Sequence, residues 1–163
     1  MKKGFTLVEL LIVVAILGIL AAVGIVSFGG FLGSTKENCT KSQHVNTLKF
    51  LQTEVLKCEM GKVTLNWLDN TGSLNSWECD PAKVNDELVE DFVNNAIKHF
   101  KGSEFKMCFK TTDDSMVRGS SCPRDVDLGR IHINANKGND SIDLYTRWEP
   151  GGNGCLKNSI QLE

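Results

Sequence analysis

The chain has 163 residues, a formal net charge of −2, six cysteines and three histidines. So small a negative charge excludes a general electrostatic attraction to nucleic acid, and the length allows one small domain beside an apolar anchor. The cysteines lack CxxC spacing and the histidines lie far apart in the sequence, which argues against a zinc site. We therefore expect no metal and no cofactor.

An apolar run dominates the N-terminal part of the chain. It extends from Phe5 to Phe28 and contains a single charged residue, Glu9. Lys2 and Lys3 precede it. About 20 apolar residues in a helix are enough to cross the hydrocarbon core of a bilayer. Because positively charged flanks stay in the cytoplasm, we expect the two lysines inside that compartment and the rest of the chain outside it.

Glu9 distinguishes this run from simpler apolar segments. A carboxylate within a membrane span costs about 2.5–3.5 kcal/mol, and such groups usually have a functional partner. A cleaved secretory signal has a shorter apolar core of about 7–15 residues, and a plain membrane anchor leaves Glu9 without a role. A buried core helix is disfavoured because no later segment is apolar enough to cover the run.

The start of the chain resembles a known processing signal. The run Lys3-Gly4-Phe5-Thr6-Leu7-Val8-Glu9-Leu10-Leu11 is similar to the class III signal of type IV pilins and the related pseudopilins. This resemblance implies that a prepilin peptidase cuts after Gly4 and that the new N-terminal residue, Phe5, is N-methylated. It also implies that Glu9 pairs with the terminal amine of a neighbouring subunit during fibre assembly.

The helical pattern continues well beyond the apolar run, so we expect one very long helix from Phe5 to Met60. Together with the resemblance, this divides the chain into a leader (residues 1–4), a transmembrane and fibre-core helix (5–33) and a globular head (34–163). The head includes the amphipathic second half of the helix, which Gly61 ends. Its apolar stripe comprises Val45, Leu48, Leu51, Val55 and Cys58, and the residues mostly off the stripe are Lys41, His44, Lys49, Glu54 and Lys57.

The next two segments are predicted to be a loop and a second helix. Residues 61–84 contain several turn signals, and we expect Trp67 and Trp77 to pin this loop to the long helix. Residues 85–101 have apolar residues at helical spacing, with acids early and lysines late. Asn85 is the expected cap, Gly102 the expected end, and His99 is expected to be solvated.

Alternation of apolar and polar residues predicts strands over residues 105–110, 131–135 and 142–147. Residues 136–140 form the expected hairpin loop between the last two. Three antiparallel strands packed against the long helix give an α+β, pilin-like fold.

Polar loops flank the last two predicted strands. Residues 111–128 form a long polar loop whose aspartates could bind calcium. We do not expect a calcium site to form here, on two grounds: the spacing of the aspartates is not that of an EF-hand, and two arginines offset their charge. Residues 151–155 are expected to be a flexible tail held by Cys155. The loop's aspartates are Asp113, Asp114, Asp125 and Asp127, and its arginines are Arg118 and Arg124.

Cysteines in a chain exported from the cytoplasm indicate disulfides. Cys39 and Cys58 lie about 28 Å apart on one predicted helix, at about 1.5 Å per residue. They cannot pair, because a disulfide needs Cα atoms within about 7 Å. The expected pairs are Cys58–Cys79, which closes the loop before the second helix, Cys122–Cys155, which staples the tail, and, by elimination, Cys39–Cys108, which ties the first strand to the long helix.

The leading hypothesis is a structural subunit of a type IV pilus that polymerises through its N-terminal helix after leader cleavage. Expected partners are copies of itself, other pilins, the prepilin peptidase and the inner membrane. Nucleic acid is not indicated, although DNA uptake is one use of such fibres beside adhesion and motility. The expected location is the bacterial inner membrane before assembly and an extracellular pilus afterwards.

Two alternatives belong to other functional classes. One is a pseudopilin of a type II secretion system, and the other is a membrane-anchored binding protein that does not polymerise. The sequence shows no nucleophile elbow, phosphate loop or metal motif, so we do not expect an enzyme.

Overall fold

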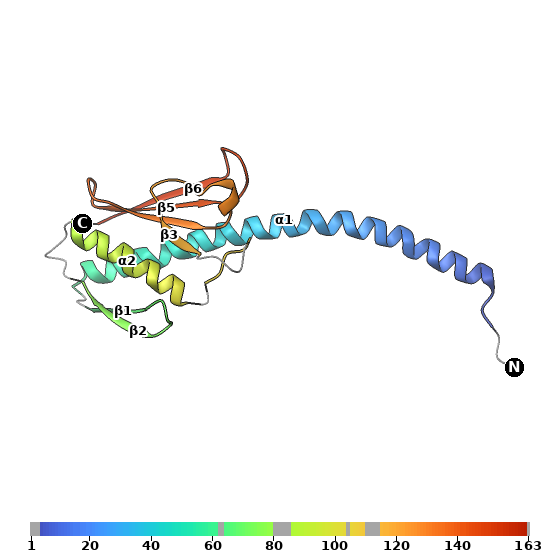
Figure 1. The fold of residues 1–163 in the computed structure, drawn as a ribbon, viewed down its shortest axis with the longest axis horizontal. Coiled ribbons are helices and arrows are strands. Elements are labelled where there is room, and N and C mark those ends of the chain that lie inside the picture. The colour runs from blue at the N-terminus through green and yellow to red at the C-terminus, as the bar shows by residue number, and fades with distance from the viewer. Residues whose placement is uncertain (1–3, 62–63, 80–85, 104, 110–114, 163) are drawn as a thin grey trace. The chain divides into compact units, whose positions relative to one another are not determined.

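The computed structural model describes residues 4–61, 64–79, 86–103, 105–109 and 115–162. The chain divides into two compact units, Met1–Thr35 and Lys36–Glu163, and helix α1 contributes residues to both. The elements are α1 (Leu7–Glu59), β1 (Thr64–Leu68), β2 (Leu74–Glu78), α2 (Asp86–Gly102), β3 (Met116–Arg118), a short 3-10 helix (Asp125–Asp127), β4 (Ile131–Asn136), β5 (Ser141–Arg147) and β6 (Cys155–Gln161), and most are labelled in Figure 1.

The first unit consists largely of the N-terminal part of α1. Its large apolar side chains are exposed in the isolated chain, as Ile25 (76%) and Phe28 (67%) illustrate. The helix contains a stretch long and apolar enough to cross a membrane, by length and composition. An apolar helix with no cover of its own needs a lipid or protein environment to remove this surface from water.

The second unit contains a four-stranded sheet in the order β3-β4-β5-β6. Strand β3 runs parallel to β4, and the other neighbours are antiparallel. The predicted strands at 131–135 and 142–147 and the hairpin between them are confirmed as β4 and β5. The buried and half-buried residues alternate along β4, as its sequence pattern predicted.

The edges of this sheet differ from the prediction. The strand expected at residues 105–110 is wrong for the described part, residues 105–109, which is irregular. The alternation there has another cause, because Met107 enters the core, Phe105 packs on Phe100, and Cys108 is bonded to Cys39 of α1. Instead, β3 lies within the segment expected to be a polar loop, and the expected flexible tail leads into β6.

Strands β1 and β2 form a separate antiparallel hairpin where a loop was expected. The sequence of β1 alternates between exposed and buried positions, and Leu65 and Trp67 are the buried ones. The ring of Trp67 lies 5.9 Å from that of Phe50 on α1, so the tryptophan does pin this segment to the long helix. Turn signals in the sequence marked the ends of the strands, and the short strands between them were missed.

Helix α2 confirms the second predicted helix, and its expected cap, Asn85, lies outside the described residues. In Figure 1 this helix lies between the four-stranded sheet and the hairpin, and it contacts both β4 and β1. The helix ends at Gly102 as expected. A side-chain carbon at this position would lie 1.7 Å from the carbonyl oxygen of Asp69, so glycine is what allows the hairpin turn to approach the helix end.

Replacing Gly102 with alanine is therefore expected to destabilise the head by about 1–3 kcal/mol, because the added methyl group has to push the Asp69 carbonyl away. Urea unfolding of the full chain in detergent measures the loss. Gly138→Ala is the matched control, since a side-chain carbon there meets nothing within 4 Å. Equal stabilities of the two variants would contradict the close approach.

The core lies between the sheet, α2 and the second half of α1, and its α1 stripe is only partly the predicted one. Leu51, Val55 and Cys58 are buried as expected, whereas Val45 is 43% exposed. Buried polar residues continue the stripe toward the N-terminus, and an analysis of apolar periodicity does not count them. The polar members of the stripe are Thr40, His44, Thr47 and Glu54.

Two of these polar residues, expected off the stripe, are tied into the head by hydrogen bonds. His44 is 1% exposed; its Nδ1 lies 2.8 Å from the Thr146 hydroxyl on β5, and its Nε2 lies 2.8 Å from the Asn158 amide oxygen on β6. Glu54 accepts a 2.9 Å hydrogen bond from the indole nitrogen of Trp67 and pairs with Lys57. Buried polar groups are tolerated where each finds such a partner.

His99 also corrects the prediction of a solvated side chain. Its Nδ1 accepts a 3.0 Å hydrogen bond from the backbone nitrogen of Leu68, and its ring stacks on Phe50 at 4.8 Å. Burial lowers the pKa of His99, so the neutral ring that this acceptor role requires is favoured. His99 thereby joins α2 to both the hairpin and the long helix.

Candidate processing and assembly site

The residues around the expected cleavage position precede helix α1. Gly4 and Phe5 lie in irregular backbone, and the Phe5 side chain is 89% exposed. A side-chain carbon at Gly4 would meet nothing within 4 Å. A protease needs an exposed peptide bond outside regular structure, and the bond between Gly4 and Phe5 lies in exposed, irregular backbone.

Glu9 takes part in a capping box at the start of α1. Its Oε2 accepts hydrogen bonds of 2.8 Å from both the backbone nitrogen and the hydroxyl of Thr6. In return, the Thr6 hydroxyl accepts a 3.3 Å hydrogen bond from the backbone nitrogen of Glu9. This reciprocal pair satisfies backbone donors that the first turn of a helix leaves open. Thr6 was missed in the sequence, although the pattern of threonine followed three residues later by glutamate is a known start signal.

The capping box leaves part of the Glu9 carboxylate available. Both hydrogen bonds from Thr6 go to Oε2, and Oε1 accepts none from the residues that the structure describes. A carboxylate has about four acceptor positions, so a donor from another molecule can still bind. The Glu9 side chain is exposed at the first turn of α1, four residues after Phe5 in the sequence.

The structure holds three disulfides in the second unit. They join the cysteine pairs expected from the sequence, and their Cα–Cα distances lie within the range that a disulfide requires. One ties α1 to the irregular segment at 105–109, one ties the end of α1 to the end of β2, and one ties the loop before β4 to the start of β6. The pairs are Cys39–Cys108 (6.0 Å), Cys58–Cys79 (5.8 Å) and Cys122–Cys155 (6.2 Å).

The aspartates considered for calcium take other roles where the structure describes them. Asp125 pairs with Arg147 at 3.2 Å, and Asp127 pairs with Arg130 at 2.9 Å. Asp113 and Asp114 lie outside the described residues. Within the described part of the chain, no three His, Cys, Asp or Glu side chains gather as metal ligands would.

Comparison with known proteins supports the N-terminal assignment. Residues 1–25 match the family model described as the prokaryotic N-terminal methylation motif. Two curated type IV major fimbrial proteins FimA from Dichelobacter nodosus are similar to the chain. One is 38% identical over 74 residues, which is 45% of this chain and 46% of the relative; the other is 34% identical over 82 residues, which is 47% and 51%. No solved structure matches.

The chain thus spans about half the length of the curated relatives that it matches. The methylation motif covers the bond at Gly4, the exposed Phe5 and the Glu9 capping box, so the comparison and the geometry meet on the same few residues. This protein carries the prokaryotic N-terminal methylation motif at residues 1–25 and is similar in sequence to type IV major fimbrial proteins.

Proposed function

We propose that this chain is a structural subunit of a type IV pilus, and not an enzyme. The observation that carries the proposal is the methylation motif placed directly at the start of an apolar helix with no cover of its own. The curated relatives are named type IV major fimbrial proteins, which agrees with a structural role. In this proposal residues 1–4 are a leader, residues 5–33 the membrane and fibre-core helix, and residues 34–163 the head.

The exposed helix supplies the driving force for assembly. Removal of apolar surface from water is worth about 25 cal/mol per Å². When the N-terminal helices of neighbouring copies pack in a bundle, they bury this apolar surface away from water, and the heads need not cover it. Before assembly the inner membrane covers the same surface, with the head on its outer side, and a prepilin peptidase cuts the bond after Gly4.

Glu9 sets the register between copies. Cleavage after Gly4 gives Phe5 a positively charged amine, and the free Oε1 of Glu9 on a neighbouring copy accepts it. A charge-assisted pair of this kind is roughly twice as strong as a neutral hydrogen bond, and more so away from water. Apolar packing alone lets helices slide past one another, whereas one charged pair for each subunit fixes their offset.

Mass spectrometry of fibres sheared from the cell surface tests this function. The mature protein is expected to begin at Phe5 and to carry one added methyl group on its amine. A chain that begins near Val23 would indicate an ordinary secretory signal, and one that retains Met1 would indicate a plain anchor. Either result would contradict the pilus subunit.

A further inference from the structure

The end of the head at which α1 enters it carries two lysines, Lys36 and Lys41. Lys36 is the first residue of the second unit, and both lie on α1. Neither side chain forms an ion pair or hydrogen bond with a residue that the structure describes. Along α1 they follow residue 33, the end of the proposed membrane helix, by about 5 and 12 Å. The headgroup layer extends over about this range beyond the hydrocarbon core of a bilayer.

Each of these lysines lies over an aromatic ring of the head. The Lys41 Nζ lies 3.4 Å from the centroid of the Trp148 ring, and the Lys36 Nζ lies 5.9 Å from that of Phe109. A ring attracts an ammonium group over its face, and the ammonium keeps N–H donors for a further acceptor. Tryptophan is enriched where membranes meet water, because its ring is apolar and carries one polar tip.

Both rings are held in place by the fold of the head. Phe109 follows Cys108, whose disulfide joins this segment to α1, and its ring lies against Gly129, where a side-chain carbon would come within 3.1 Å. The backbone nitrogen of Trp148 donates a 2.8 Å hydrogen bond to the Gly154 carbonyl. A preformed surface loses little conformational freedom on binding.

The described charges at this end of the head are positive on balance. Arg124, Arg130 and Arg147 face only two acids, Asp125 and Asp127, with which they form ion pairs. The remaining charged side chains are three lysines and two glutamates, although the whole chain has a net charge of −2. These five are Lys36, Lys41, Lys106, Glu37 and Glu149. A basic surface beside a membrane attracts anionic lipids.

We propose that this end of the head, defined by Lys36, Lys41, Phe109 and Trp148, binds anionic phospholipid headgroups of the membrane that α1 spans. Helix side chains tilt toward the N-terminus, so both lysines reach back along α1 to the headgroup phosphates. The Trp148 ring lies in the same headgroup layer. This inference rests on the membrane span of the proposed function and concerns the subunit before assembly.

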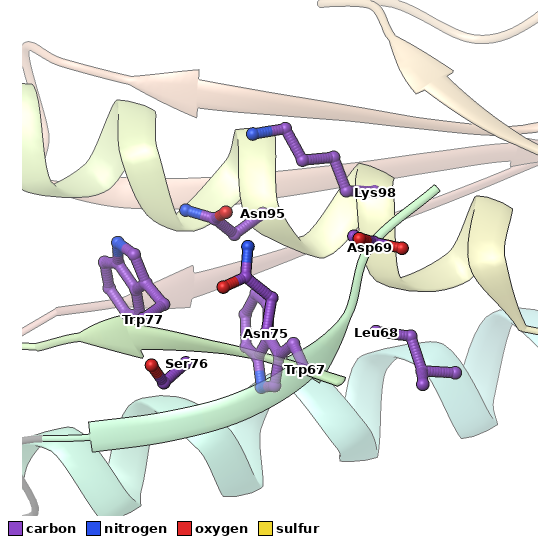
Figure 2. Close-up of a pocket in the computed structure, with 8 residues that line it drawn as sticks. All are labelled: Trp67, Leu68, Asp69, Asn75, Ser76, Trp77, Asn95 and Lys98. Atoms are coloured by element: carbon purple, nitrogen blue, oxygen red, sulfur yellow. The ribbon is translucent and has the colours of Figure 1, made fainter. Parts of the chain in front are cut away.

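Fluorescence quenching in nanodiscs that hold one full-length chain each tests the contact. The discs contain phosphatidylcholine alone or a mixture with anionic phosphatidylglycerol, and nitroxide groups on some headgroups quench nearby indoles. Trp67 and Trp77 lie between the β1–β2 hairpin and α2 (Figure 2). Trp67 is bonded to Glu54, about 20 Å beyond Lys41 along α1. The quenching that is lost in the variant W148F therefore reports on Trp148.

We expect Trp148 to be quenched at least about twice as strongly in the discs with phosphatidylglycerol, because each lysine near an anionic surface changes affinity about fivefold. The variant K36Q/K41Q is expected to lose this dependence on lipid charge. The matched control K49Q/K98Q removes two exposed lysines elsewhere in the head and should keep it. Thermal unfolding shows whether each variant is folded. If K36Q/K41Q does not fold, the single change K36Q at the exposed position replaces it.

Three results would overturn the proposal. They are the absence of Trp148 quenching in both kinds of disc, equal quenching in the two, and the same lipid dependence in K36Q/K41Q as in the control. Protection of Trp148 from soluble iodide only in discs with two chains would assign the surface to a second copy, and would also overturn it. In these cases the membrane span stands, whereas a chain that does not enter the discs would overturn both the span and the headgroup contact.

Discussion

Replacing Glu9 with glutamine is expected to reduce the yield of surface fibres at least about tenfold while the subunit still accumulates in the membrane. The neutral amide loses the charge-assisted part of the contact with a neighbouring amine, which is worth about 1 kcal/mol or more for each subunit added. Insertion into the membrane is not impaired, because removing a charge from a span makes insertion easier. Quantification of sheared fibres against membrane-bound subunit measures both effects.

Glu9→Gln separates the effect of the Glu9 charge on assembly from the effect of Glu9 on capping the start of α1. Glutamine also serves in a capping box, so the hydrogen bond from the Thr6 nitrogen is retained in Glu9→Gln. Thr6→Ala makes the opposite change: it removes the hydroxyl, at a cost of about 1 kcal/mol in helix capping, and keeps the carboxylate. We expect Thr6→Ala to assemble more fibre than Glu9→Gln, and Glu37→Gln, a change in the second unit, to assemble as wild type. Wild-type yields from Glu9→Gln would exclude the pairing.

Acid is expected to destabilise the head, with His44 as the main cause. Burial lowers the pKa of His44 below its ordinary value of about 6.5, although its bond to Asn158 works in the opposite direction. The unfolded chain therefore binds a proton at a higher pH than the folded chain does. Stability is complete above about pH 6.5 and falls as the pH drops toward the folded pKa, by up to about 1.4 kcal/mol for each pH unit.

The hydrogen bonds of His44 explain why protonation of its neutral ring is unfavourable. In the neutral ring, Nε2–H donates to the Asn158 oxygen, and Nδ1 accepts the Thr146 hydroxyl proton. A second ring proton, on Nδ1, removes that acceptor and places a charge between α1 and the sheet.

Urea unfolding from pH 7.5 to pH 5, with the disulfides intact, measures this dependence. His44→Gln is expected to be less stable at pH 7.5, by about 1–3 kcal/mol, but to lose less of its stability on acidification. His132→Gln is the control: burial also lowers the pKa of His132, but this ring is half-buried at the sheet surface, so its removal should flatten the curve less. Equal pH slopes in wild type and His44→Gln would contradict the role of His44.

The sequence predicted the features that depend on long patterns. The apolar run, the amphipathic half of α1, helix α2 and strands β4 and β5 all follow from periodicity repeated over many residues. The three cysteine pairs could be predicted because the alternative pair Cys39–Cys58 is impossible when both residues lie on a single helix. The predicted processing residues, Gly4 and Phe5, come from a short pattern in which each position has its own chemistry, and residues 1–25 match the methylation motif.

Apart from the capping residue Thr6, the features that were missed depend on tertiary contacts. The strands β1 and β2 have only five residues each, and β2 shows no alternation of buried and exposed positions; Trp67 of β1 packs on Phe92 of α2. His44, Glu54 and His99 were assigned to the surface by polarity, yet each is held inside by a partner distant in the sequence or across the fold. Such partners are known only once the chain is folded.

A reconstruction of purified fibres by electron cryomicroscopy tests the central claim most directly. The account predicts a core of packed N-terminal helices in which the Phe5 nitrogen of one copy lies within about 3 Å of a Glu9 carboxylate oxygen of another. The chain should begin at Phe5, and the heads should face outward. A fibre in which Glu9 meets no amine, or in which residues 1–4 are still present, would contradict the account.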